Sequence, residues 1–240
     1  MSRPALRIAA LLAALALGAA LIYGLTAYEF VPSVWRFVER RHPALDRMGT
    51  CAFTKVGIPG DPLNLAFIGS EEALQRAMLR AGWQPADPIT LKSSLRIAVD
   101  SVVHRPYLDA PVSDLYINGK KQDLAFEQAA AGDPSKRHHV RFWIAAERDA
   151  LDRPLWMGAA TFDSGIGLSH ETGQITHHIA PEVDAERDKL LKDLQALGSL
   201  SFRWIDEFQP QRSGKNGGGD RYVTDGRLAV IVAGEAASHP

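Results

Sequence analysis

The chain has 240 residues, enough for one domain with a sizeable hydrophobic core and for two domains at most. Hydrophobic residues make up 46% and charged residues 23%, which excludes a wholly disordered chain, a collagen-like chain and a membrane protein of many helices. The 27 basic and 28 acidic side chains give a net charge of −1, so no overall field attracts nucleic acid and we expect no nucleic-acid partner. The single cysteine, Cys51, excludes an intramolecular disulfide.

The first element in chain order is an apolar stretch near the N-terminus. Residues 8–28 contain no charged side chain, and a helix of this length, rising about 1.5 Å per residue, spans a hydrocarbon core of about 30 Å. A cleaved signal peptide is the competing interpretation, because basic residues precede the stretch and alanine is abundant within it. Tyr23, Tyr28 and Phe30 occupy its end in place of a small-x-small cleavage site, which favours an uncleaved membrane anchor.

A strand followed by a helix is predicted next. The apolar run Leu63–Ile68 is typical of a strand, and Ser70 is suited to cap the helix that follows. Apolar residues at helical spacing continue to Ala81, and Gly82 fits the position just after the helix. After a break that contains prolines, the spacing predicts a second helix over Leu91–Val102.

The middle of the chain is rich in strand signals. The dipeptide Asn118-Gly119, within residues 114–128, predicts a β-hairpin. Pro181 is suited to the first position of a helix that continues to Leu197. Further strands are predicted, mostly from the alternation of apolar and polar residues, over 137–145, 154–163, 174–179 and 200–208.

The C-terminal segment has a different composition. Residues 209–220 are rich in glycine and are expected to form a flexible linker, and residues 222–232 to form a short hairpin or an unanchored tail. Hairpins and helices without regular strand–helix alternation indicate an α+β domain with a mainly antiparallel sheet and about three helices, preceded by one transmembrane helix. The expected division is an anchor or signal peptide at 1–28, a juxtamembrane segment at 29–59, the folded domain at 60–208, and a flexible linker and tail at 209–240.

Histidine is concentrated in one part of the sequence, since five of the eight histidines lie between residues 138 and 178. Adjacent residues of a strand point to opposite faces, so each histidine pair is divided between two faces. This geometry makes His138 a packed residue, groups His177 with Ile175 and Ile179, and leaves His139 and His178 facing polar partners. The predicted polar site consists of His139, Arg141, Thr161, Asp163, His170 and His178.

Three interpretations of this cluster are open. The histidines can be ordinary members of a sheet and its loops, hydrogen-bonded to backbone and carboxylates. They can form a metal site, for which His139, His170, His178 and Asp163 are the candidate ligands, although no compact motif such as H-E-x-x-H is present. They can line an anion or phosphate pocket, since guanidinium groups bind phosphate through paired hydrogen bonds. The residues that support the third interpretation are Lys136, Arg137, His139 and Arg141, with Arg96 and Arg105 as further candidates.

Several segments together resemble the LssY-type C-terminal domain. They include Gly60–Asn64, Arg105–Tyr107, Ala110–Ser113, Arg137–Trp143 and, most specifically, the run GAATFDSGIGLSHETGQITHHIAPEVDAER at residues 158–187, and they extend over residues 60–198. The resemblance implies a bacterial envelope protein close to lipid phosphates, because larger members carry a membrane region that resembles the DedA or type 2 phosphatidic acid phosphatase families. It implies no established activity. The Ser-Arg, His and Asp signature of the phosphatase itself is missing from this sequence.

The resulting functional hypothesis is a membrane-anchored accessory or ligand-binding domain of the bacterial envelope that binds an anionic or phosphate-bearing ligand. The first alternative is a hydrolase, metal-assisted or directed at a phosphoester, that uses the His/Asp cluster. The second is a structural component of a secretion or envelope assembly. We expect a single-pass protein of the bacterial inner membrane with its soluble domain in the periplasm. The membrane and an envelope protein or lipid phosphate are its expected partners, and the sequence identifies no cofactor.

Overall fold

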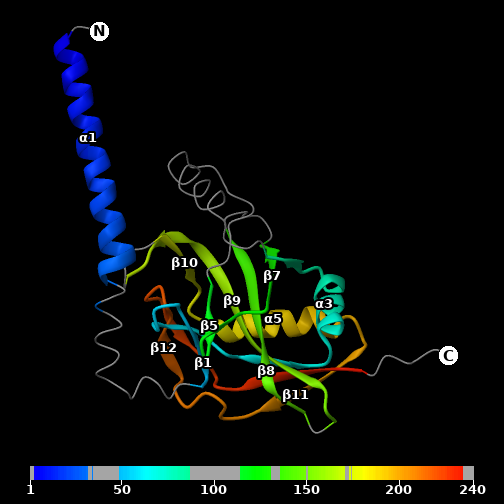
Figure 1. Ribbon diagram of the computed structural model, residues 1–240. Helices are drawn as coiled ribbons and strands as arrows, with labels where there is room; N and C mark the ends of the chain where they lie inside the picture. The colour runs from blue at the N-terminus through cyan, green and yellow to red at the C-terminus, as the bar shows by residue number, and fades with distance from the viewer. Residues whose placement is uncertain are drawn as a thin grey trace.

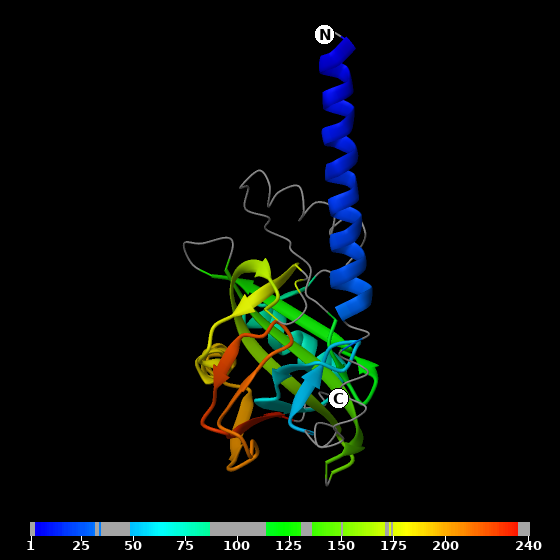
Figure 2. The same ribbon diagram turned by 90° about the vertical axis from the view of Figure 1, so that its left-hand side faces the viewer.

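A computed structural model describes residues 3–31, 34, 49–86, 114–130, 136–149, 151–170, 173 and 175–234. The chain begins with a long helix, α1 (Arg3–Leu25), which continues into a short π-helix, η1 (Thr26–Phe30). This helix extends away from the rest of the protein, as both views show (Figure 1 and Figure 2). The predicted second helix over Leu91–Val102 lies outside the described residues.

The apolar side chains of α1 are exposed on all sides of the helix. Leu11, Leu15 and Leu21 are 61%, 62% and 63% exposed, far more than the side chains of a helix packed in a soluble core. Residues Arg7–Phe30 are long and apolar enough to cross a membrane, as the sequence predicts. The exposed apolar surface fits a membrane-anchored domain, and a signal sequence has the same composition.

The centre of the domain is an eight-stranded sheet in which β14 and β3 are parallel and every other pairing is antiparallel. The α+β class with a mainly antiparallel sheet is therefore confirmed. Its order is β11 (Leu200–Ile205), β14 (Leu228–Ala233), β3 (Leu65–Ile68), β9 (Pro154–Leu168), β8 (Arg137–Arg148), β7 (Leu124–Ala129) and β4 (Gln84–Pro85), with β10 (Ile175–Ile179) paired to β9.

Two helices pack on one face of this sheet. They are α3 (Glu71–Arg80) and α5 (Val183–Gln195), and their buried leucines share one hydrophobic core with Phe67, Phe142 and Trp156 of the sheet. The predicted start of α3 is confirmed, because the Ser70 hydroxyl accepts a hydrogen bond from the Ala73 backbone N–H.

The opposite face is covered by smaller sheets. The hairpin predicted at Asn118-Gly119 is present, and both residues have positive φ, 50° and 77°, as a two-residue hairpin turn requires. Both views place these small strands below the lower end of α1 (Figure 1 and Figure 2). One sheet consists of β2 (Pro59–Pro62), β1 (Cys51–Phe53), β5 (Tyr116–Ile117) and β6 (Lys120–Lys121), and the other of β12 (Ser213–Lys215) and β13 (Arg221–Val223).

The C-terminal segment differs from its prediction. Instead of a flexible linker followed by a hairpin or tail, it forms the β12–β13 hairpin and then β14, which lies inside the main sheet between β11 and β3. The glycines make a tight turn: the Asn216 side-chain oxygen accepts the backbone N–H groups of Gly218 and Asp220, and Gly219 has a φ of 84°. The glycines of this segment serve a tight turn. Composition alone does not distinguish such a turn from a flexible linker.

Candidate functional site

The centre of the site is a row of buried polar residues on β8 and β9. These strands pair so that His139 lies opposite Thr161 and Arg137 opposite Asp163, and strand alternation turns all four side chains, with Arg141, to the face away from the helices. His139 is 1% exposed, Thr161 0% and Asp163 4%. Four predicted site residues, His139, Arg141, Thr161 and Asp163, thus share one face.

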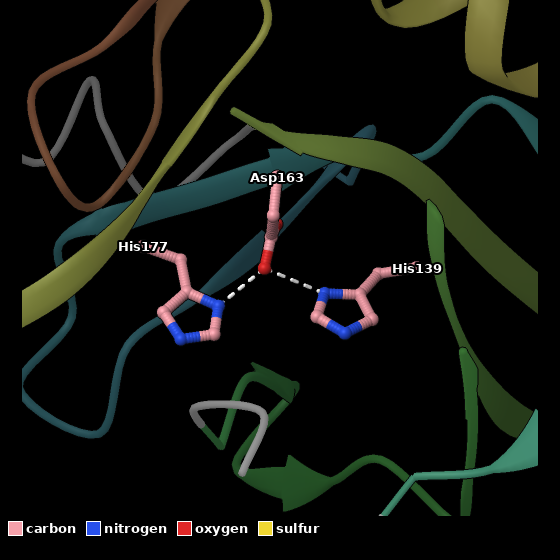
Figure 3. Close-up of side chains that lie close together, drawn as sticks. All are labelled: His139, Asp163 and His177. Atoms are coloured by element: carbon pink, nitrogen blue, oxygen red, sulfur yellow. Dashed lines mark hydrogen bonds and ion pairs between the residues drawn. The ribbon is translucent and has the colours of Figure 1, made fainter. Parts of the chain in front are cut away.

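Asp163 lies between two histidines. Its Oδ2 atom is 2.8 Å from Nδ1 of His139 and also contacts Nδ1 of His177 (Figure 3). The two imidazole rings are stacked, with centroids 6.0 Å apart and an interplanar angle of 10°. Burial alone would raise the pKa of Asp163, but the two histidines outweigh it and lower this pKa far below its usual range.

Sequence reasoning missed His177. It correctly grouped His177 with Ile179, but this face is not apolar, because Ile179 pairs directly with Asp163. The pairing shifts between His178 and Ile179, so that β9 contains a bulge after Asp163 and Asp163 lies diagonally across from His177. The tandem His177-His178 was the available signal, since it supplies a histidine to each face of the strand.

A second layer of charges supports His139. Its Nε2 atom is 3.2 Å from the Glu127 carboxylate, which also accepts a hydrogen bond of 3.1 Å from Arg137. Burial opposes protonation of His139, but the carboxylates of Asp163 and Glu127 outweigh it and raise the pKa of this histidine. Burial likewise opposes ionisation of Glu127, but His139 and Arg137 lower its pKa. The sequence did not identify Glu127, which approaches only through the pairing of β7 with β8.

Arg141 is paired with a buried carboxylate from the smaller sheet. Its Nη1 atom donates a hydrogen bond of 2.7 Å to Asp61, while its Nε atom has no hydrogen-bond partner in the described part of the chain. Burial raises the pKa of Asp61, although the charge of Arg141 opposes this effect. Asp61 belongs to the segment Gly60–Asn64 that carried the family resemblance, but nothing local in the sequence marks it as a partner of Arg141.

A cavity of about 320 Å³ lies against this row. Asp61, Arg141, Asp163 and His177 form a polar wall, and Tyr28 at the end of the N-terminal helix also lines the cavity. The remaining lining residues come from the β1–β2 loop, β2, the β5 region, β10 and the segments around Ser169 and Asn216; they include Thr54, Lys55, Thr176, Gly217 and Gly218.

His170 and His178 form a separate group around Asp220. Nδ1 of His178 is 2.7 Å from Oδ1 of Asp220, whereas Nδ1 of His170 is 3.7 Å away and His170 is 66% exposed. The single predicted cluster is therefore two groups in the structure. Asp220 was missed because it lies in the glycine-rich segment expected to be a linker.

Strand alternation separates His138 from the site. His138 faces the helices, where its Nδ1 atom is 2.7 Å from Glu186, which agrees with its predicted role as a packed residue. Arg96 and Arg105 lie outside the described residues.

Comparison with known proteins identifies one family. The family model described as LssY C-terminus matches residues 44–228. No curated protein and no solved structure matches the chain.

Proposed function

The chain belongs to the LssY C-terminus family, and we propose that it is a membrane-anchored domain that binds a small phosphate-bearing ligand at the bilayer surface. The observation that carries this proposal is the cavity of about 320 Å³, whose wall contains the buried Arg141 and whose rim contains Tyr28 of the N-terminal helix. A pocket of this size accommodates a lipid headgroup or a small phosphate ester.

Several groups of the lining can bind an anion, although Asp61, Asp114 and Asp163 line the same cavity. The Nε atom of Arg141 is a buried donor without a hydrogen-bond partner among the described residues, and Lys55 adds a second positive charge. The Thr54 hydroxyl group and the backbone of Gly217 supply neutral donors. The positive charge of Arg141 compensates the negative charge of Asp61, so this pair adds no excess negative charge to the wall of the cavity.

The contacts of the N-terminal helix support a position close to the membrane. The Tyr23 hydroxyl donates a hydrogen bond to the Gly173 carbonyl, and Ala27 is buried against the domain. Tyrosine is favoured where a spanning helix leaves the hydrocarbon. A helix docked in this way is better explained as a retained anchor than as a cleaved signal peptide. We propose a bacterial inner-membrane location with the domain in the periplasm, which reporter fusions to the C-terminus test directly.

Isothermal titration calorimetry on the full chain in detergent tests ligand binding, with inorganic phosphate and glycerol 3-phosphate as probes. We expect saturable binding that weakens about 10-fold or more in Arg141→Gln, because a hydrogen bond to a charged group contributes about 1.5–3 kcal/mol. Arg80→Gln, a change at an exposed position of α3, is the matched control and is expected to bind as the unmodified chain does. Absence of saturable heat with both probes would contradict the proposal.

A hydrolase is the second candidate function, and the pairing of His139 and His177 with Asp163 favours it. A histidine oriented by a carboxylate beside a cavity is a common arrangement for a general base. Release of phosphate from a generic aryl phosphate by the full chain, lost in His177→Ala, supports this function. A chain that binds glycerol 3-phosphate without turnover is a binding domain only.

A further inference from the structure

Two histidines and one carboxylate converge at the wall of the cavity in a way that phosphate binding does not require. One ligand-type atom from each of His139, Asp163 and His177 lies within 4.8 Å of the others. They come from β8, β9 and β10, so three neighbouring strands position them (Figure 3). His139 and Asp163 are almost completely buried, unlike the acidic clusters that occur by chance on protein surfaces.

The surroundings of His139 orient this group for a cation. A carboxylate accepts hydrogen bonds, so Glu127, 3.2 Å from Nε2, favours the tautomer with hydrogen on that atom. Nδ1, the other ring nitrogen, then lies 2.8 Å from Oδ2 of a second carboxylate, that of Asp163, without forming a regular hydrogen bond to it in the described part of the chain. Two acceptors at this distance need a proton or a cation between them. A carboxylate on the outer nitrogen of a histidine is also the usual second layer of a metal site.

We propose that His139, Asp163 and His177 bind one divalent transition-metal ion, with Zn²⁺ the best match. Two imidazole nitrogens and one carboxylate oxygen suit Zn²⁺, and three protein ligands leave the fourth tetrahedral position open. Bonds of about 2.0–2.1 Å place tetrahedral donors about 3.4 Å apart. Both Nδ1–Oδ2 separations, the one of 2.8 Å to His139 and the shorter one to His177, therefore have to widen through rotations of the side chains.

The open position faces the cavity, because Asp163 and His177 both line it. A dication there would add positive charge beside Arg141 and would contact an anion in the pocket directly. The metal site does not depend on the phosphate proposal, however, since all three ligands are provided by the protein.

The group of His170, His178 and Asp220 is a matched comparison within the same chain. It also contains three ligand-type atoms within 4.8 Å. His170 is 66% exposed, however, and the second oxygen of Asp220 accepts the Ile179 backbone N–H at 3.0 Å. We expect this group to bind metal more weakly, so His170→Ala is the control variant.

The test uses the full chain in detergent, stripped with a chelator and titrated with Zn²⁺ or Co²⁺ alone. We expect about one tightly bound metal per chain, and a Co²⁺ complex with the intense visible bands of tetrahedral coordination. Affinity should fall at least about 100-fold in His177→Ala and remain unchanged in His170→Ala. Arg141→Gln should retain Zn²⁺ while losing phosphate, which separates the two proposals.

Glu127→Gln keeps all three ligands and provides a second test if His177→Ala does not fold. It should weaken Zn²⁺ binding about 10- to 100-fold, as expected for the loss of an outer-layer carboxylate. Failure of the unmodified chain to retain stoichiometric metal overturns the proposal. Loss of metal in His170→Ala with full retention in His177→Ala also overturns it, because the ion would then belong to the Asp220 group.

Discussion

At the scale of single residues, Arg187 joins α5 to the C-terminal strands. Its side chain is 0% exposed and forms two hydrogen bonds with the Asp225 carboxylate, of 2.9 and 3.0 Å. Asp184 and Asp188 contact the same guanidinium, and its Cζ atom lies 4.7 Å from the ring centroid of Trp204. A buried guanidinium is tolerated only with such partners, because an unpaired charge in this position would remain desolvated.

Replacement of Arg187 by leucine should therefore destabilise the protein. The change leaves three carboxylates near one another without their shared cation. We expect the free energy of unfolding to fall by about 2–4 kcal/mol. The loss is smaller than for fully buried acids because these three carboxylates are partly exposed. Urea unfolding followed by circular dichroism measures the difference. Arg203→Leu, at an exposed position of the edge strand β11, is the control, and an equal loss in both variants would contradict the prediction.

Asp225 gives a pH-dependent prediction. Burial opposes its ionisation, but hydrogen bonds from Arg187 and Arg227 outweigh burial and lower its pKa in the folded protein. A carboxylate whose pKa is lower in the folded than in the unfolded protein stabilises the folded state. This contribution is complete above the unfolded-state pKa of about 3.9 and is lost as the pH falls through the folded-state pKa. Asp225→Asn should thus be less stable than the unmodified chain at pH 7, and the gap should narrow towards pH 3. A gap that is constant with pH would exclude this origin of stability.

At the scale of elements, the β9–β10 hairpin organises both histidine groups. The bulge after Asp163 brings His177 to one group, while His178 reaches Asp220 across Gly167. No side chain fits at Gly167, since a Cβ atom there would lie 2.5 Å from Nε2 of His178. The hairpin therefore needs glycine at this position for close packing, independently of its backbone conformation.

Gly167→Ala should displace the His178 ring from Asp220. We expect a loss of about 1–3 kcal/mol in stability, the usual cost of inserting a methyl group into a packed site. Urea unfolding measures this loss, and the NMR chemical shifts of the His178 ring should show its displacement from the carboxylate. Leu168→Ala is the control on the same strand, because Leu168 is 56% exposed, and it should change stability by less than about 0.5 kcal/mol.

The elements predicted well from sequence are those that depend on local signals. Ser70 as a helix cap, the Asn118-Gly119 turn and the alternation of β8 each depend on a few neighbouring residues. Strand alternation also placed His139, Arg141, Thr161 and Asp163 on one face. The partners that complete the site, Asp61, Glu127, His177 and Asp220, depend on strand register, a bulge and contacts between distant segments, which a single sequence does not specify.

At the scale of the whole molecule, the segment after residue 208 joins distant parts of the chain. The Gln209 side chain donates hydrogen bonds of 2.6 and 2.8 Å to the carbonyls of Thr50 and Leu63. β14 pairs with β3 in parallel. Because the two strands are far apart in the sequence, no local pattern distinguishes β14 from a terminal tail. Asp220 and Tyr222 contribute to the site and its buried surroundings from the same segment.

A chain ending at residue 208, the expected end of the domain, should consequently fail to fold. Removal of β14 exposes the edges of both β3 and β11 and removes Ala229 and Ile231 from the main core. We expect no cooperative thermal transition and a broad, aggregated profile on size exclusion in detergent. A chain ending at Gly234 retains every strand that the structure describes and should unfold at the temperature of the full chain. Cooperative unfolding of the shorter chain at that same temperature would show that the domain folds without its C-terminal strands. Loss of the cooperative transition would show that β14 is a central part of the fold, on which the positions of His139, Asp163 and His177 depend.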